Sequence, residues 1–149
     1  MPAGTSYLFK EGMLQPEITK TAALDKTKEY YAIGVKNFFL HAVHPLAWFK
    51  KLEIEIDEKQ MALEKAYFVL RGQWFHIMDM PTITEVYWNL AEEAQLLLPA
   101  EERLEQGKHH VKITFTMSML EDSQVMDKKG LWPHRVEFVE EDLKLEVEG

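Results

Sequence analysis

Strict alternation of apolar and polar side chains in two segments constrains this chain more than any other feature. In residues 48–57, every second residue from Trp48 faces one way, and every second residue from Phe49 faces the other. Residues 110–119 alternate in the same way, with hydrophobic side chains at every second position from Val111. A period of two is typical of a β-strand with one face on a core and one in water. Both segments are therefore predicted to be strands.

The rest of the chain contains further short apolar runs separated by turn-forming residues. Arg71-Gly72 between two such runs predicts a β-hairpin. The last two runs are out of phase with each other, which predicts a bulge or turn at residues 140–142. Residues 89–106 suit either a helix or a buried strand, and residues 37–47 suit a loop. The runs expected to form strands are residues 28–36, 66–70, 73–77, 85–88, 135–138 and 143–147.

Many short strands without an alternating strand–helix pattern predict an all-β fold. We expect an antiparallel β-sandwich or a barrel-like sheet with at most short helical turns. A chain of 149 residues is the size of one domain, so residues 1–149 are expected to form a single one. Residues 1–27 are weakly patterned and are a candidate docking arm.

Charge and composition exclude several classes of function. The net charge of −8 disfavours binding to nucleic acid or to an anionic membrane surface. The chain contains no cysteine, which removes disulfides, thiolate nucleophiles and cysteine-type zinc sites. Neither a secretory signal nor an apolar stretch long enough to span a membrane is recognisable. We expect a soluble protein of the cytoplasm.

The histidines are the obvious candidates for chemistry. His41 and His44 are three residues apart and could supply two of the three protein ligands of a catalytic metal. No third ligand has a diagnostic spacing, so no metal site is predicted, although an autonomous histidine–metal enzyme stays an alternative. The sequence also lacks a glycine-rich phosphate loop and a GxSxG nucleophile motif. No catalytic residue is predicted in this chain.

Aromatic residues beside expected loops are the other notable feature. Phe38, Phe39, Trp48 and Trp132 all lie in or next to such loops. An exposed tryptophan among polar residues indicates either a protein interface or a platform on which a sugar stacks. We favour the interface, and a free-standing carbohydrate-binding module that uses Trp74 or Trp132 is the alternative.

The order and spacing of several segments point to a known family. They run from Tyr31–Lys36 through a loop ending in His44-Pro45 to Leu52–Asp57, the hairpin from Tyr67 to Phe75, Val86–Trp88 with residues 91–98, and Leu104–Ile113. This arrangement resembles the small (β) subunit of bacterial C-glycoside deglycosidases over about residues 28–119. The resemblance suggests a strand at residues 91–98 and a short helical turn at residues 99–104.

The resemblance implies a small β-sandwich subunit bound to a larger TIM-barrel subunit similar to xylose isomerase. That subunit would carry a divalent metal, expected to be manganese, together with the acid and base groups. The complex would cleave the carbon–carbon bond between a 3-oxo-glucosyl group and an aromatic aglycone such as a flavonoid. A base would remove the C2 proton that the 3-keto group makes acidic, and elimination would expel the aglycone.

On this interpretation the chain is an accessory part of a hetero-oligomer and is inactive alone. Its loops would contact the large subunit or shape the entrance for the 3-oxo-C-glucoside. The expected contact residues are Phe38, Phe39, His41, His44, Trp48 and Trp132.

Overall fold

The computed structural model describes residues 10–22, 29–39, 43–100, 104–117 and 135–145. The elements are β1 (Leu14–Ala22), β2 (Glu29–Lys36), β3 (Val43–Pro45), the 3₁₀ turn η1 (Leu46–Trp48), β4 (Phe49–Ile56), β5 (Lys59–Gln60), β6 (Tyr67–Leu70), β7 (Gln73–His76), the 3₁₀ turn η2 (Ile77–Thr82), β8 (Tyr87–Asn89), β9 (Glu93–Pro99), β10 (Gly107–Met117) and β11 (Arg135–Leu145). No helix among these residues is long and apolar enough to cross a membrane.

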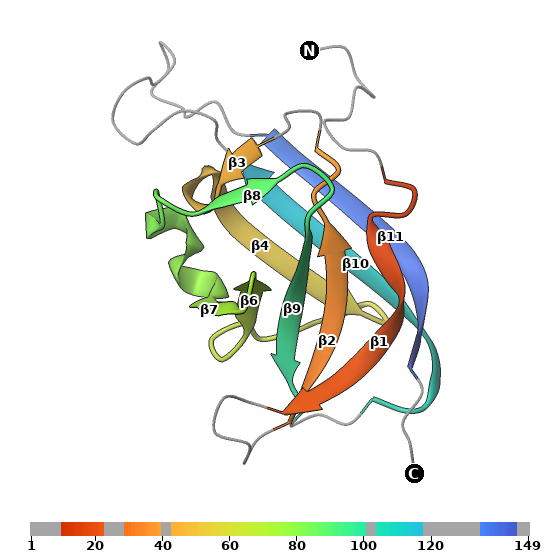
Figure 1. Cartoon of the computed structure of the whole chain (residues 1–149). Coiled ribbons are helices and arrows are strands. Elements are labelled where there is room, and N and C mark those ends of the chain that lie inside the picture. Colours follow the sequence, from red (N-terminus) through yellow and green to blue (C-terminus); the bar gives the residue numbers. More distant parts are fainter. Residues whose placement is uncertain (1–9, 23–28, 40–42, 101–103, 118–134, 146–149) are drawn as a thin grey trace.

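Nine of the strands form one curled sheet, an open half-barrel (Figure 1). Their order is β5-β4-β10-β11-β1-β2-β9-β6-β7, and β3 pairs with β8 in a separate two-stranded sheet. The sheet is mixed because β1 and β11 run parallel, whereas the other pairs are antiparallel. The prediction of a mainly β, barrel-like fold with only short helical turns is confirmed.

We name the two ends of the sheet after the short strands β8 and β5 that lie there. At the β8 end, β2 and β10 finish, β4, β9 and β11 begin, and the β3–β8 pair lies across these strand ends (Figure 1). At the opposite, β5 end, a tight turn joins β4 to β5, β10 begins and β11 finishes.

The concave face of the sheet holds the core. Alternate residues of each strand point into it, and aromatic rings fill its β8 end. The Phe39 ring lies 5.2 Å from Phe115 and 5.5 Å from Phe49, centroid to centroid, in edge-to-face contacts. Trp88 packs against Phe68 at 5.2 Å and is completely buried. Such rings contribute most of the buried apolar area of a small domain.

Strand β4 differs from its expected pattern at its first residues. The alternation predicted Phe49 on the polar face, whereas Phe49 is buried in the core. The register against β10 shifts here, because Met117 pairs with Phe49 while Thr116 pairs with Lys51. The irregularity at Lys50 turns Phe49 inward and leaves the alternation from Leu52 onward as predicted.

The predicted bulge or turn at residues 140–142 is wrong. Strand β11 pairs with β10 without a register shift from Arg135 to Leu145. Its first apolar residues, Val136 and Phe138, lie on the outer face, while Glu137 is buried on the inner one. The ammonium groups of Lys10 and Lys112 lie 4.0 and 4.7 Å from the centre of the Phe138 ring, which explains how the ring is tolerated outside.

Three other segments were placed incompletely by the sequence. Residues 14–22 of the candidate docking arm form β1 inside the sheet, and the rest of residues 1–27 lies mostly outside the described residues. The expected loop at residues 37–47 contains β3 and most of η1. The ambiguous segment contains the strand β9, while residues 101–103 of the expected helical turn are not described.

Candidate protein interface

Four of the six expected contact residues have a described backbone, and all four lie at the β8 end. Phe38 follows β2 and is half-buried against the core. Phe39 is only 1% exposed, so its ring is part of the core and not of the free surface. Trp48 closes η1 and is half-buried, and the backbone of His44 pairs with Trp88. His41 and Trp132 lie outside the described residues.

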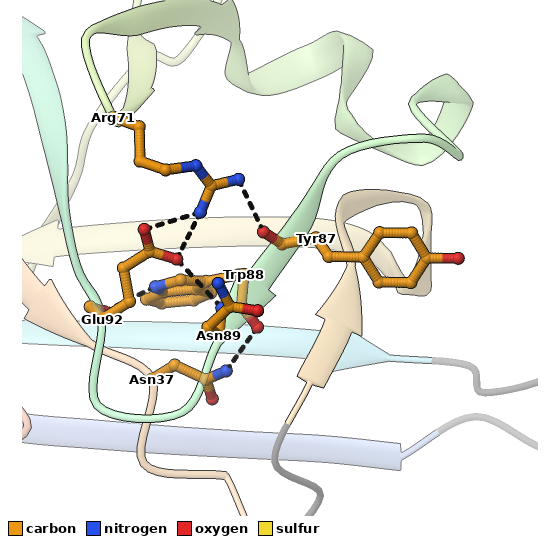
Figure 2. A network of polar contacts seen from close by, with 6 residues as sticks. All are labelled: Asn37, Arg71, Tyr87, Trp88, Asn89 and Glu92. Atoms are coloured by element: carbon orange, nitrogen blue, oxygen red, sulfur yellow. Dashed lines mark hydrogen bonds and ion pairs between the residues drawn. The ribbon is translucent and has the colours of Figure 1, made fainter.

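A network of polar contacts fixes the turn between β8 and β9 (Figure 2). The Glu92 carboxylate accepts hydrogen bonds from Nη1 of Arg71 at 2.5 and 2.6 Å and from the backbone N–H of Asn89 at 3.0 Å. Nη2 of Arg71 donates to the Tyr87 carbonyl at 2.9 Å, and Nε1 of Trp88 donates to the Glu92 carbonyl at 2.7 Å. The bonds between the Arg71 guanidinium and the Glu92 carboxylate join two charged groups, and such bonds are stronger than those between neutral groups. Arg71 therefore ties the β6–β7 hairpin to both sides of the turn.

Asn37, which follows β2, holds the same turn through side-chain and backbone hydrogen bonds. It is completely buried, and its side-chain amide donates to the Trp88 carbonyl at 2.8 Å. The Asn37 backbone also pairs with Glu92 at 3.1 Å and with Ala91 at 2.8 Å. Ala91 has a φ of 61°, a left-handed conformation that costs free energy without a glycine. The hydrogen bonds around it compensate for that cost and hold one conformation.

The network presents exposed apolar side chains on a rigid support. Tyr87 is 47% exposed and Leu90 is 56% exposed. Figure 2 shows the Tyr87 ring pointing away from the network. Met78, in η2, is also largely exposed, and it borders a groove of about 240 Å³ between η2 and β4. A turn whose backbone is already fixed loses little entropy on binding, which suits a protein interface.

Sequence reasoning did not find Tyr87, Leu90 or Met78. Alternation in residues 85–88 puts Tyr87 and Trp88 on opposite faces, so one of the two had to face outward. This alternation could have identified Tyr87 as a candidate for the exposed position. Nothing in the sequence indicated that Arg71 and Asn37 would meet Glu92, because these residues come from three separate segments.

The alternative platform residue, Trp74, belongs to a group on the outer face of the sheet. Its ring centre lies 5.3 Å from Tyr67 and 6.0 Å from Tyr30, both in edge-to-face contacts. We call Tyr30, Tyr67 and Trp74 the outer aromatic group. Trp74 is half-buried within it, so part of the indole remains accessible.

Metal ligands do not gather within the described part of the chain. No group of three or more His, Asp or Glu side chains there could hold a metal ion. The histidine pair His41 and His44 is not included in this finding, because the His41 position and the His44 side chain are not described.

Comparison with known families identifies the chain. A family model described as the C-glycoside deglycosidase beta subunit matches residues 9–120, well over half of the sequence. The chain belongs to this family. The matched range includes Asn37, Arg71 and the whole β8–β9 turn, and it ends before β11. A β subunit implies a partner subunit. No curated protein matches the sequence.

Proposed function

We propose that the chain is the accessory small subunit of a heteromeric C-glycoside deglycosidase. The complex cleaves the carbon–carbon bond of 3-oxo-C-glucosides with flavonoid-type aglycones. The partner is a TIM-barrel subunit that carries the divalent metal, manganese being expected, and the acid and base groups. The family match over residues 9–120 is the observation that carries this proposal. The cytoplasm is its proposed location.

We place the contact with the large subunit at the β8 end. Support comes from the rigid β8–β9 turn, which exposes Tyr87 and Leu90 beside the half-buried Phe38 and Trp48. Tyrosine and tryptophan are enriched at the positions that dominate binding energy, especially where surrounding residues exclude water. On this proposal the chain contributes contacts near the substrate entrance, and the proton transfers take place on the large subunit.

The test is to search the neighbouring genes for a xylose-isomerase-like barrel and to co-express it with the chain. A stable complex should form and should cleave a 3-oxo-C-glucoside, whereas the isolated chain should not. Turnover by the purified chain alone would overturn the proposal. So would the failure of any such barrel to form a complex with it.

Variants test where the barrel binds. Leu90→Asp and Tyr87→Ala should each weaken the complex by about 30-fold, because losing a well-packed anchor costs about 2 kcal/mol. Thr19→Asp is the control, since Thr19 is exposed in the middle of β1, away from the β8 end. If Thr19→Asp weakens binding and Leu90→Asp does not, the β8 end is not the interface, although the subunit assignment stands.

The outer aromatic group supports a second candidate, a free-standing carbohydrate-binding module. Trp74 is half-buried beside two tyrosines, and partly accessible aromatic rings can stack on sugars. This function predicts that glycosides change the tryptophan fluorescence of the isolated chain and that Trp74→Ala abolishes the change. No response at millimolar glycoside would remove this candidate.

A further inference from the structure

Two adjacent histidines of β10 lie at the β5 end of the sheet, and each stands between two hydrogen-bond acceptors. The His109 side chain points inward and is 9% exposed. Its Nδ1 lies 2.6 Å from Oδ2 of Asp57, in the β4–β5 turn, and its Nε2 lies 2.5 Å from the Glu105 carbonyl oxygen. This ring therefore connects β10 to the β4–β5 turn and to the segment before β10.

His110 points to the outer face and makes the equivalent contacts with β11. Its Nδ1 lies 2.9 Å from Asp142, and its Nε2 lies 3.0 Å from Glu140. The His110 backbone amide also donates to Oδ1 of Asp57 at 2.9 Å. The same aspartate thus accepts bonds from both histidines.

The chemistry of imidazole gives these contacts a definite charge state. A neutral imidazole has one N–H donor and one bare nitrogen, whereas the protonated ring has two donors. Carboxylate and carbonyl oxygens can only accept, so both nitrogens of His109 and both of His110 must carry hydrogen for all four bonds to exist. All four contacts are hydrogen bonds only when each ring is an imidazolium.

The electrostatic surroundings favour that state. Burial lowers the pKa of His109, but the hydrogen bonds to the Glu105 carbonyl and to Asp57 outweigh it, and the net pKa is raised. The hydrogen bonds to Asp142 and then to Glu140 raise the pKa of His110.

Cations also lie close to these groups. Lys112 and Lys10 are near Glu140, and they help His110 to lower the pKa of that carboxyl group. Other charged residues at neighbouring register positions are Lys108 on β10, Glu141 and Lys144 on β11, and Glu55 on β4.

We propose that Asp57, Glu105, His109, His110, Glu140 and Asp142 form a pH-sensitive latch at the β5 end of the sheet. While both rings are protonated, the latch holds the β4–β5 turn, the segment before β10 and the last residues of β11 on β10. Loss of a proton turns one N–H of each ring into a lone pair that faces an oxygen. Water cannot easily replace the lost bond at the buried His109, so this end of the sheet opens locally.

Nuclear magnetic resonance of the full chain tests the latch. The ring nitrogens of His109 and His110 should both be protonated at about pH 6, and both rings should titrate above about 6.5, the ordinary value for a histidine. His76, which is exposed on β7 with no carboxylate contact among the described residues, supplies the control variant below. Midpoints at or below the ordinary value would overturn the proposal.

Amide hydrogen exchange measures the opening itself. After correction for the intrinsic rate, protection of Leu143 and Leu145 should fall about tenfold or more between about pH 6 and pH 9. Protection of Leu96, in β9 and away from the latch, should not change. His109→Gln should show the low protection at both pH values, and His76→Gln should behave as wild type. If protection is independent of pH in the wild type, the histidines are structural contacts only and the latch is excluded.

Discussion

Replacing Asn37 with alanine tests how the β8 end is held. The side-chain amide of Asn37 donates to the Trp88 carbonyl at 2.8 Å, and its oxygen accepts from the Phe39 amide at 3.3 Å. The substitution removes both bonds at a site that is completely buried. The backbone bonds of Asn37 to Ala91 and Glu92 are retained.

The magnitude follows from these two bonds. A hydrogen bond contributes about 0.5–1.5 kcal/mol net, and a buried group that loses its bond costs about 1–3 kcal/mol. We expect Asn37→Ala to lower the free energy of unfolding by about 2–4 kcal/mol. That is a large part of the roughly 5–15 kcal/mol of an ordinary domain, and it lowers Tm by roughly 4–16 °C.

Urea unfolding followed by tryptophan fluorescence is the assay. The midpoint should fall for Asn37→Ala while the m value stays constant, which identifies a change in stability and not in the unfolded state. Gln60→Ala is the control, because Gln60 is exposed and its bond to Glu53 is on the surface, so its effect should be within about 0.5 kcal/mol. A loss below about 1 kcal/mol for Asn37→Ala would refute the role of this side chain.

Three more predictions use the same assay. Gly34→Ala should destabilise the fold by about 1–3 kcal/mol, because its new Cβ would lie 2.5 Å from Cγ of Gln15; the double variant with Gln15→Ala should recover part of the loss. Trp88→Phe should cost about 1–3 kcal/mol, since it replaces a buried indole with a smaller ring and removes the indole N–H bond to the turn. Hydrogen bonding to His109 lowers the pKa of Asp57, so its stabilisation is present above about pH 4 and is lost as pH falls through the lowered value. Asp57→Asn should therefore be less stable than wild type at about pH 6, where His109 is protonated, and should converge with wild type below the lowered pKa of Asp57.

The two strands that the sequence predicted from strict alternation, β4 and β10, have one buried and one more exposed face. Strand β4 spans Phe49–Ile56 against a prediction of 48–57, and β10 spans Gly107–Met117 against 110–119. The hairpin predicted at Arg71-Gly72 is also confirmed, since β6 pairs with β7 across these two residues. Both residues adopt the positive φ angles that such a two-residue turn requires. In these elements the local pattern and the global fold agree.

The residue pattern alone left β9 undecided and did not indicate β1, whereas the strand that the family resemblance suggested at residues 91–98 is confirmed by β9. Leu96, Leu97 and Leu98 of β9 are all buried, because the core covers one face and the outer aromatic group covers the other. A strand buried on both faces loses its alternation, so the leucine run looked equally helical. In β1 the register shifts between Leu14 and Ile18, which breaks the period of two and hid the strand.

The candidate interface was only partly predictable for a related reason. The sequence places aromatic residues next to loops, but whether each ring is buried or exposed depends on the tertiary packing. The Phe39 ring is buried in the core, whereas the Tyr87 side chain is exposed. The contacts that fix the turn join Asn37, Arg71 and Glu92 across the sheet, and no short-range pattern contains them.

The two ends of the sheet are held by different chemistry, and this difference separates the two proposals experimentally. Among the described side chains, the hydrogen bonds that fix the β8–β9 turn involve a guanidinium, a carboxylate, an amide and an indole, and no histidine. The β5 end depends on His109 and His110, and histidine is the side chain that titrates between about pH 5 and 8. Raising the pH from about 6 to 9 should therefore open the β5 end while the hydrogen bonds of the β8–β9 turn persist. In a variant with His41→Gln and His44→Gln, which lacks the titratable side chains expected to contact the large subunit, the affinity for that subunit should change little over the same range. A parallel loss of both in this variant would mean that the latch and the partner share one surface, which contradicts the placement of the interface at the β8 end.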